Sequence, residues 1–122
     1  EQILHIINHY LRSDNRHPDG NFYQVSKTVS GKFDLRNNKL KQLHINDKPI
    51  EKDQTYRVCL EEFHFRNMVG KFNLPKEDFE KLNPKIVSSS CRDVIIEYLS
   101  EHQNLSSKVE GRIVDLFEPF VV

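Results

Sequence analysis

The 122-residue chain has two cysteines, four glycines, one methionine and no tryptophan. Cys59 and Cys91 match no zinc-ligand spacing, and a secreted disulfide scaffold of this size would use more cysteines. They allow one disulfide, but the usual burial of small free cysteines favours two unpaired buried thiols. The four glycines stand apart in the sequence, which excludes a glycine-rich loop that would cradle a phosphate.

Net charge and long apolar runs are absent as well. The 18 basic and 18 acidic residues give a formal net charge of +0, whereas nucleic acid or an anionic membrane surface calls for a basic footprint. No apolar run approaches the roughly 18 residues of a membrane span. The composition therefore predicts neither nucleic-acid binding nor a membrane span. Basic residues are denser over 27–58, where we favour a solvated hairpin surface over an anion-binding face.

The length predicts a single domain over residues 1–122. Apolar side chains recur at helical spacing from the first residues, so the start predicts a helix over 2–13 rather than a signal peptide. A chain that opens directly on this helix without Met indicates a segment of a longer protein. The compartment of that protein is not readable from this start.

Alternating apolar residues and turn signals predict strands over 22–28, 32–36, 55–60 and 111–117. Leu43 and Ile45 continue the alternation beyond a turn at 37–38. Ser90 can cap a second helix over 91–102, whose expected buried stripe is Val94, Ile95, Tyr98 and Leu99. The stretch 61–87 is irregular. The predicted fold class is mixed α/β (α+β-like), with mostly antiparallel, hairpin-built sheets flanked by helices.

No catalytic constellation emerges from the residues. His5 and His9 share one helical face, but no Glu follows His5, and two surface histidines are the favoured interpretation over a metal site. No nucleophile elbow and no two-metal phosphoesterase string occurs. Cys91 falls in a first helical turn without a nearby His in sequence, so a structural role is favoured. The chain by itself does not predict an enzyme, a catalytic residue or a bound metal.

Aromatic residues crowd the irregular stretch. A Phe ring on a loop, beside a glycine and an amide side chain, can stack on a flat base. The alternative is that the rings anchor the stretch on the core, and the residues alone favour this alternative. The rings concerned are Phe63, Phe65, Phe72 and Phe79.

Several strings resemble one known family in order and spacing. The string SCRDVIIEYL at 90–99, followed by VEGRI at 109–113, is similar to the closing helix and strand of the 5′-nucleotidase C-terminal domain. FYQVS at 22–26 resembles its F-x-Q-V-S/G strand. INDKPI at 45–50 and DQTYRV at 53–58 resemble its V-N-G-K-P-L…D-K-T-Y-x-V hairpin. Each string is weak alone, and together they identify the chain as resembling this family over nearly its whole length.

The resemblance implies a division of labour with a part of the protein outside this chain. In such enzymes an N-terminal metallophosphoesterase domain holds two divalent metal ions, which hydrolyse the phosphate ester. The C-terminal domain grips the nucleoside between two Phe rings and rotates to deliver the phosphate. The partners implied are a nucleotide or nucleoside-like small molecule and that N-terminal domain. The resemblance favours an exported protein, in the periplasm or at the cell surface, over a cytoplasmic one.

The resemblance also implies the binding residues. LEEFHFRNMVG at 60–70 aligns without gaps on a family motif like L-x-N-F-L-A-N-G-G-D-G, which places Phe63 on a base-stacking ring. The resemblance implies nucleotide-binding roles for Phe63 and Gly70, and for Gly20 on a loop whose backbone lines the base pocket. Asn67 falls on a family glycine and is a further candidate, because its amide could take over from the family's ribose-binding aspartate. The family's ribose-binding aspartate falls on Val69, which accepts no hydrogen bond from a hydroxyl.

Two functions from different classes follow. The first is the substrate-recognition domain of a metal-dependent 5′-nucleotidase-like hydrolase, a phosphoesterase of nucleotide catabolism. The alternative, suggested by Val69, is a non-catalytic binding or interaction module that keeps the fold without nucleotide specificity. An isolated catalytic domain finds no support in the residues.

Overall fold

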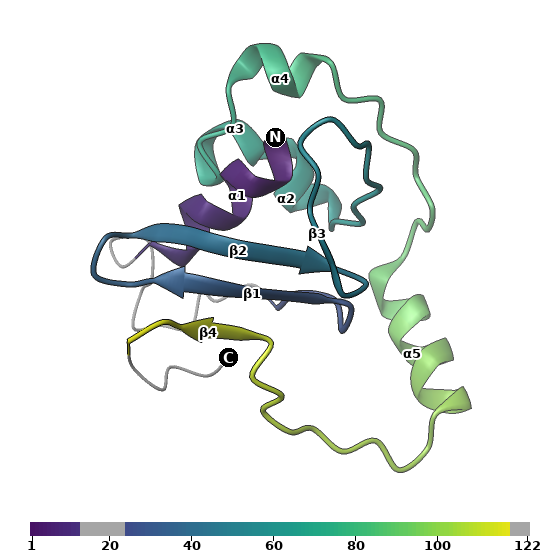
Figure 1. Cartoon of the computed structure of the whole chain (residues 1–122). Helices are drawn as coiled ribbons and strands as arrows, with labels where there is room; N and C mark the ends of the chain where they lie inside the picture. Colours follow the sequence, from purple (N-terminus) through teal and green to yellow (C-terminus); the bar gives the residue numbers. More distant parts are fainter. Residues whose placement is uncertain (13–23, 118–122) are drawn as a thin grey trace.

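The computed structural model describes residues 1–12 and 24–117. Along the chain a helix, α1 (Gln2–Leu11), precedes three strands, β1 (Val29–Asp34), β2 (Lys39–Ile45) and β3 (Lys48–Pro49). Four helices follow, α2 (Glu62–Arg66), α3 (Met68–Lys71), α4 (Lys76–Glu80) and α5 (Cys91–Glu101), before the last strand, β4 (Ile113–Asp115). The strands form one sheet in the order β3-β2-β1-β4. Figure 1 shows α1 to α4 gathered on one side of this sheet.

The sheet is mostly antiparallel, as predicted. β1 pairs with β2 and β2 with β3 in antiparallel register, while β4 lies parallel to β1. Asparagines supply the turns: Asn38 has φ 50° between β1 and β2, and Asn46 and Asp47 have φ 53° and 61° before β3. Asn and Asp tolerate this left-handed conformation better than other non-glycine residues. The mixed α/β class and the hairpin construction are therefore confirmed.

The main core lies between α1 and the sheet. Ile7, Tyr10 and Leu11 of α1 are buried against Phe33, Leu43 and Ile113 of the strands. Burial raises the pKa of the Tyr10 hydroxyl to about 12. The side-chain oxygen of Asn8 accepts a 2.6 Å hydrogen bond from the backbone N–H of Leu40, which ties α1 to β2. The helix predicted over 2–13 is confirmed and ends two residues earlier.

Two strand predictions are wrong in the described residues. Phe22 and Tyr23 lie outside them, and residues 24–28 form no strand; β1 begins at Val29 and ends at Asp34. Residues 55–60 form no strand either. An alternating segment forms a strand only if it can pair with the edge of a sheet. The edge strand β3 has only two residues, and one of them, Pro49, has no backbone N–H to donate.

A second, smaller core supports the stretch that the sequence left irregular. Met68, Phe72 and Leu74 are buried together, with Ile6 of α1 and the rings of Phe65 and Phe79 packed against them. His5 adds a polar tie, because its Nε2 lies 2.8 Å from the carbonyl oxygen of Asn73. Three short helices thus occupy this stretch, anchored on α1.

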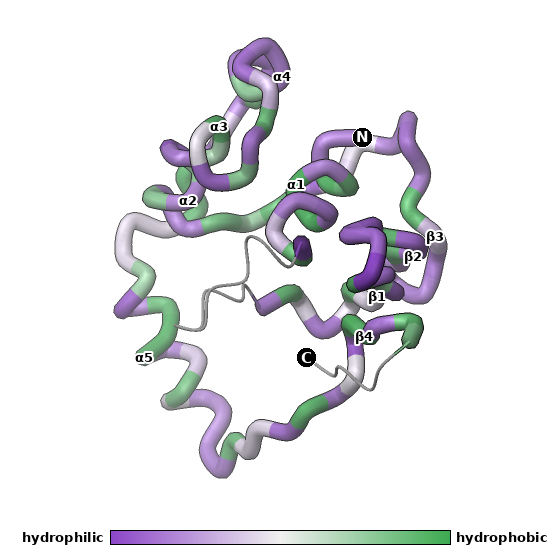
Figure 2. The backbone as a smooth tube through the Cα atoms, turned by 90° about the vertical axis from the view of Figure 1, so that its left-hand side faces the viewer, coloured by the Kyte–Doolittle hydropathy of each residue, from purple (hydrophilic) through white to green (hydrophobic). Residues whose placement is uncertain are grey.

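The helix α5 forms as predicted but its predicted burial is wrong. The Ser90 hydroxyl accepts a 3.1 Å hydrogen bond from the backbone N–H of Asp93, as expected of the cap. Every residue of α5 is exposed, and both views show this helix standing away from the sheet (Figures 1 and 2). The expected stripe is about half exposed: Val94 47%, Ile95 51%, Tyr98 51% and Leu99 51%.

The cysteines also differ from expectation. Cys59 and Cys91 are free and both are exposed, so the prediction of buried thiols is wrong. Cys91 shares the exposure of α5, and Cys59 that of residues 55–60. Both cysteines are exposed because neither α5 nor the segment 55–60 packs on the core.

Candidate functional site

The helices α2 and α3 divide their side chains between a buried and an exposed face. Phe65, Met68 and Phe72 recur at spacings of three and four and turn toward the second core. Phe63, Asn67, Val69, Gly70 and Lys71 are exposed, and we call this set the Phe63 surface. The anchoring interpretation is therefore right for Phe65, Phe72 and Phe79, and it does not hold for Phe63.

The ring of Phe63 is 54% exposed. Its neighbours are the His64 ring, edge-on at 5.5 Å between centroids, and the Lys71 ammonium, 4.9 Å from the ring centroid. An exposed aromatic ring can serve as a platform on which a base stacks. The geometry therefore leaves the predicted stacking role open to Phe63, and the role itself stays a prediction.

Asn67 holds the junction between α2 and α3. It lies at the end of one helix and the start of the next, with φ −102° and ψ 13°. Its Nδ2 donates a 2.7 Å hydrogen bond to the carbonyl oxygen of Phe63, which also accepts the Asn67 backbone N–H at 3.2 Å. One N–H of the Asn67 side-chain amide thus binds the Phe63 backbone. The second N–H of this amide and its oxygen can donate to and accept from a ligand.

Gly70 and its neighbours differ in what the fold requires of them. A Cβ built on Gly70 would meet nothing within 4 Å, so packing gives no reason for glycine there. Met68, at a family glycine position, is buried and belongs to the second core. Val69, which the resemblance aligns with the family's aspartate, is 40% exposed. At Val69 the Phe63 surface therefore presents two methyl groups, which accept no hydrogen bond.

The remaining predicted sites give mixed results. Gly20 lies outside the described residues. The His5 and His9 rings stack at 6.4 Å between centroids, and the Nε2 of His5 is engaged by a carbonyl, as surface histidines can be. Among residues 1–12 and 24–117, no three His, Cys, Asp or Glu side chains gather as metal ligands would. These residues do not fit a two-metal centre. No helix in the described ranges is long and apolar enough to cross a membrane.

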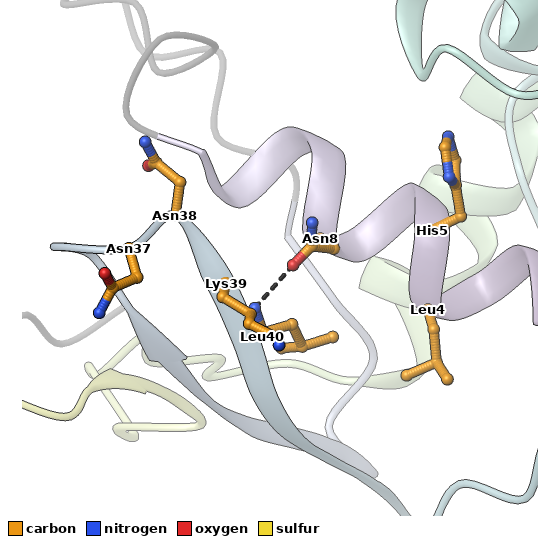
Figure 3. Close-up of a pocket in the computed structure, with 7 residues that line it drawn as sticks. All are labelled: Leu4, His5, Asn8, Asn37, Asn38, Lys39 and Leu40. Atoms are coloured by element: carbon orange, nitrogen blue, oxygen red, sulfur yellow. Dashed lines mark hydrogen bonds between the residues drawn. The ribbon is translucent and has the colours of Figure 1, made fainter.

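A groove of about 500 Å³ lies elsewhere, between α1 and the β1–β2 turn. Figure 3 shows Asn8 reaching from α1 to the backbone of Leu40 at its centre, with Asn37 and Asn38 at one end. The Asn8 oxygen is thus used by the fold. None of the predicted binding residues lines this groove; its lining residues are Leu4, His5, Asn8, Asn37, Asn38, Lys39 and Leu40.

Comparison with known proteins defines the class. The family model described as 5′-nucleotidase, C-terminal domain, matches residues 1–77, which include the sheet hairpins and the whole Phe63 surface. The chain therefore belongs to the 5′-nucleotidase C-terminal domain family, the C-terminal substrate-binding domain of 5′-nucleotidases. Searches of curated proteins and of solved structures returned no match.

The matched range separates two parts of the resemblance. The strings at 22–26, 45–50, 53–58 and 60–70 lie inside it, whereas those at 90–99 and 109–113 lie outside. The resemblance of α5 and β4 to the family's closing helix and strand stays a prediction. The sequence reasoning missed Lys71, because a lone lysine after a glycine carries no pattern, and only its position over the Phe63 ring singles it out.

Proposed function

We propose that the chain is the substrate-recognition domain of a metal-dependent 5′-nucleotidase-like hydrolase acting on phosphate esters of nucleotides. The single observation that supports this most is the 54% exposure of the Phe63 ring, which the resemblance aligns with a base-stacking ring. The other three rings of this stretch, Phe65, Phe72 and Phe79, pack in the second core. Membership of the family supports nucleotide-related binding. The chemical step belongs to a part of the protein outside this chain.

The role of this chain would be to bind and orient the ligand. Phe63 would stack on the base, Asn67 would hold the Phe63 backbone and offer its amide, and Gly70 would let a ligand approach the α3 backbone closely. Two divalent metal ions on an N-terminal metallophosphoesterase domain would supply the hydrolytic chemistry. The described residues hold no suitable ligand set, so no step of that chemistry is assigned to them.

A phosphatase assay of the full-length protein with AMP and Mn²⁺ tests this proposal. We expect turnover that a chelator abolishes, and a KM that rises roughly ten- to a hundredfold in Phe63→Ala, because base–aromatic stacking contributes about 1–3 kcal/mol. The 122-residue chain assayed alone should show no turnover. An unchanged KM in Phe63→Ala would contradict the stacking role.

The second candidate is a binding or interaction module that has lost nucleotide specificity. Val69 favours it, since a valine in place of the family's aspartate removes the acceptor for ribose hydroxyls. In that case the full-length protein would show no metal-dependent turnover and no AMP binding. The sequence preceding this chain separates the two functions, because an intact set of metal-ligand motifs is required by the hydrolase and not by the module.

A further inference from the structure

Three basic side chains lie on α2 and α3, and two of them lie beside a carboxylate of this chain. The Arg66 Nε donates a 2.8 Å hydrogen bond to the Glu62 carboxylate, one helical turn earlier. The His64 Nε2 lies 3.7 Å from the Glu61 carboxylate. Each of these two basic groups therefore has an acidic group of this chain beside it.

Lys71 differs from both. Its ammonium lies over the Phe63 ring, 4.9 Å from the centroid, and in the part of the chain that the structure describes no carboxylate lies within ion-pair distance of it. A phenyl ring attracts a cation but does not neutralise it. The Phe63 surface consequently combines a flat apolar ring with one uncompensated positive charge.

This combination favours a particular ligand chemistry. A phosphate accepts charge-assisted hydrogen bonds from an ammonium group, which are stronger than a cation–π contact at an exposed site. The flexible lysine stem can swing from the ring face to an anion nearby without moving α3. A neutral ligand that stacks on Phe63 gains nothing from Lys71. Val69 cannot accept a hydrogen bond from the hydroxyl groups of such a ligand.

We propose that Lys71 is a specificity-determining residue that makes the Phe63 surface prefer aromatic ligands bearing a phosphate over their uncharged counterparts. For this family the comparison is a nucleotide against its nucleoside. The inference rests on the proposed function, because it takes Phe63 as the ring on which the base stacks. It names Lys71 as the residue that discriminates between nucleotide and nucleoside on a surface that has Val69 in place of the family's aspartate.

The test measures the dissociation constants of AMP and adenosine for the full-length protein by titration calorimetry. EDTA is present throughout so that metal-dependent hydrolysis does not consume AMP. The variants are Lys71→Ala, Lys71→Arg and Phe63→Ala, with Lys32→Ala as the matched control, since Lys32 is an exposed lysine in the middle of β1. Each binding series is repeated at low and high NaCl, because salt screens an exposed ion pair.

We expect Lys71→Ala to raise the Kd of AMP by about tenfold, to change that of adenosine by less than about twofold, and to remove the salt dependence of AMP binding. Lys71→Arg should retain most of the AMP affinity, and Lys32→Ala should match the wild type. Equal effects of Lys71→Ala on both ligands, or no effect on either, would overturn the proposal.

Phe63→Ala separates this inference from the function on which it rests. If Phe63→Ala raises the Kd of both ligands, and Lys71→Ala changes the two Kd values equally or not at all, the stacking role stands and the role of Lys71 is overturned. If Phe63→Ala changes neither Kd, or the wild type binds no AMP, the proposed function fails, and the role of Lys71 fails with it.

Discussion

The side-chain amide of Asn67 donates a 2.7 Å hydrogen bond to the carbonyl oxygen of Phe63, four residues earlier. Asn67 lies between the last residue of α2 and the first residue of α3, and its backbone N–H donates to the same carbonyl oxygen. Met68 and Phe72 bury the opposite side of the same turn. An exposed aromatic residue is thus held by a polar contact beside it and an apolar core beneath it.

Exposure separates the consequences of truncating two phenylalanines. Phe63→Ala should change the free energy of unfolding little, because the ring is 54% exposed. Phe33→Ala removes a ring that is 3% exposed in the main core and should cost about 3–5 kcal/mol. Urea denaturation followed by circular dichroism measures both. Comparable losses for the two variants would make Phe63 a core anchor.

Gly70 is predicted to be dispensable for the fold. A Cβ there meets nothing within 4 Å, and alanine is the better helix former, so Gly70→Ala should stabilise the protein by about 0.5–1 kcal/mol. If a ligand approaches the α3 backbone at this point, the same variant should weaken AMP binding. Thermal unfolding and AMP titration of one variant check both effects. Unchanged affinity would remove Gly70 from the binding surface.

Gly31 shows the opposite requirement and is the natural comparison. A Cβ at Gly31 would lie 2.7 Å from the backbone carbonyl oxygen of Gln42 in the neighbouring strand. The strands would have to move apart, so Gly31→Ala should destabilise the fold by about 1–3 kcal/mol. Denaturation measured beside Gly70→Ala tests this. Equal stability of the two variants would contradict the close packing of β1 and β2.

Acid should weaken the β1–β2 turn through Asp34. The hydrogen bond from the Asn37 side chain, aided by the Lys41 ammonium at 3.3 Å, holds the pKa of the Asp34 carboxyl below its usual range. Because the folded pKa is depressed, this stabilisation is present above the unfolded pKa of about 4 and is lost as pH falls through the folded value. Asp34→Asn should be less stable at pH 7 and lose less stability below pH 4. Parallel acid-dependence curves for variant and wild type would refute this.

Local chemistry made part of this fold predictable. The turns at Asn38 and Asn46 follow from residues that tolerate positive φ, and α5 follows from the Ser90 cap. Burial was less predictable, because it depends on a partner surface that no local pattern specifies. The apolar stripe of α5 and the alternation over 55–60 both indicate burial, and neither segment packs on the core.

The candidate site was also predictable only in part. A family motif singled out Phe63 and Gly70, and spacing alone could not tell the exposed ring of Phe63 from the packed rings of Phe65 and Phe72. The engagement of the Asn67 amide and the placement of Lys71 over the Phe63 ring are tertiary facts. They depend on how α3 follows α2, which a one-residue change in helix phase would alter.

On the proposed function, the Phe63 surface binds the base of a nucleotide. The most direct measurement is an AMP titration followed by NMR of the protein with its phenylalanine rings and backbone amides assigned. We expect ring-current shifts of the Phe63 ring protons, with amide shifts centred on Asn67, Gly70 and Lys71, while the buried Phe33 ring stays unchanged. AMP-induced shifts that bypass these residues, or no shifts at saturating AMP, would contradict the claim.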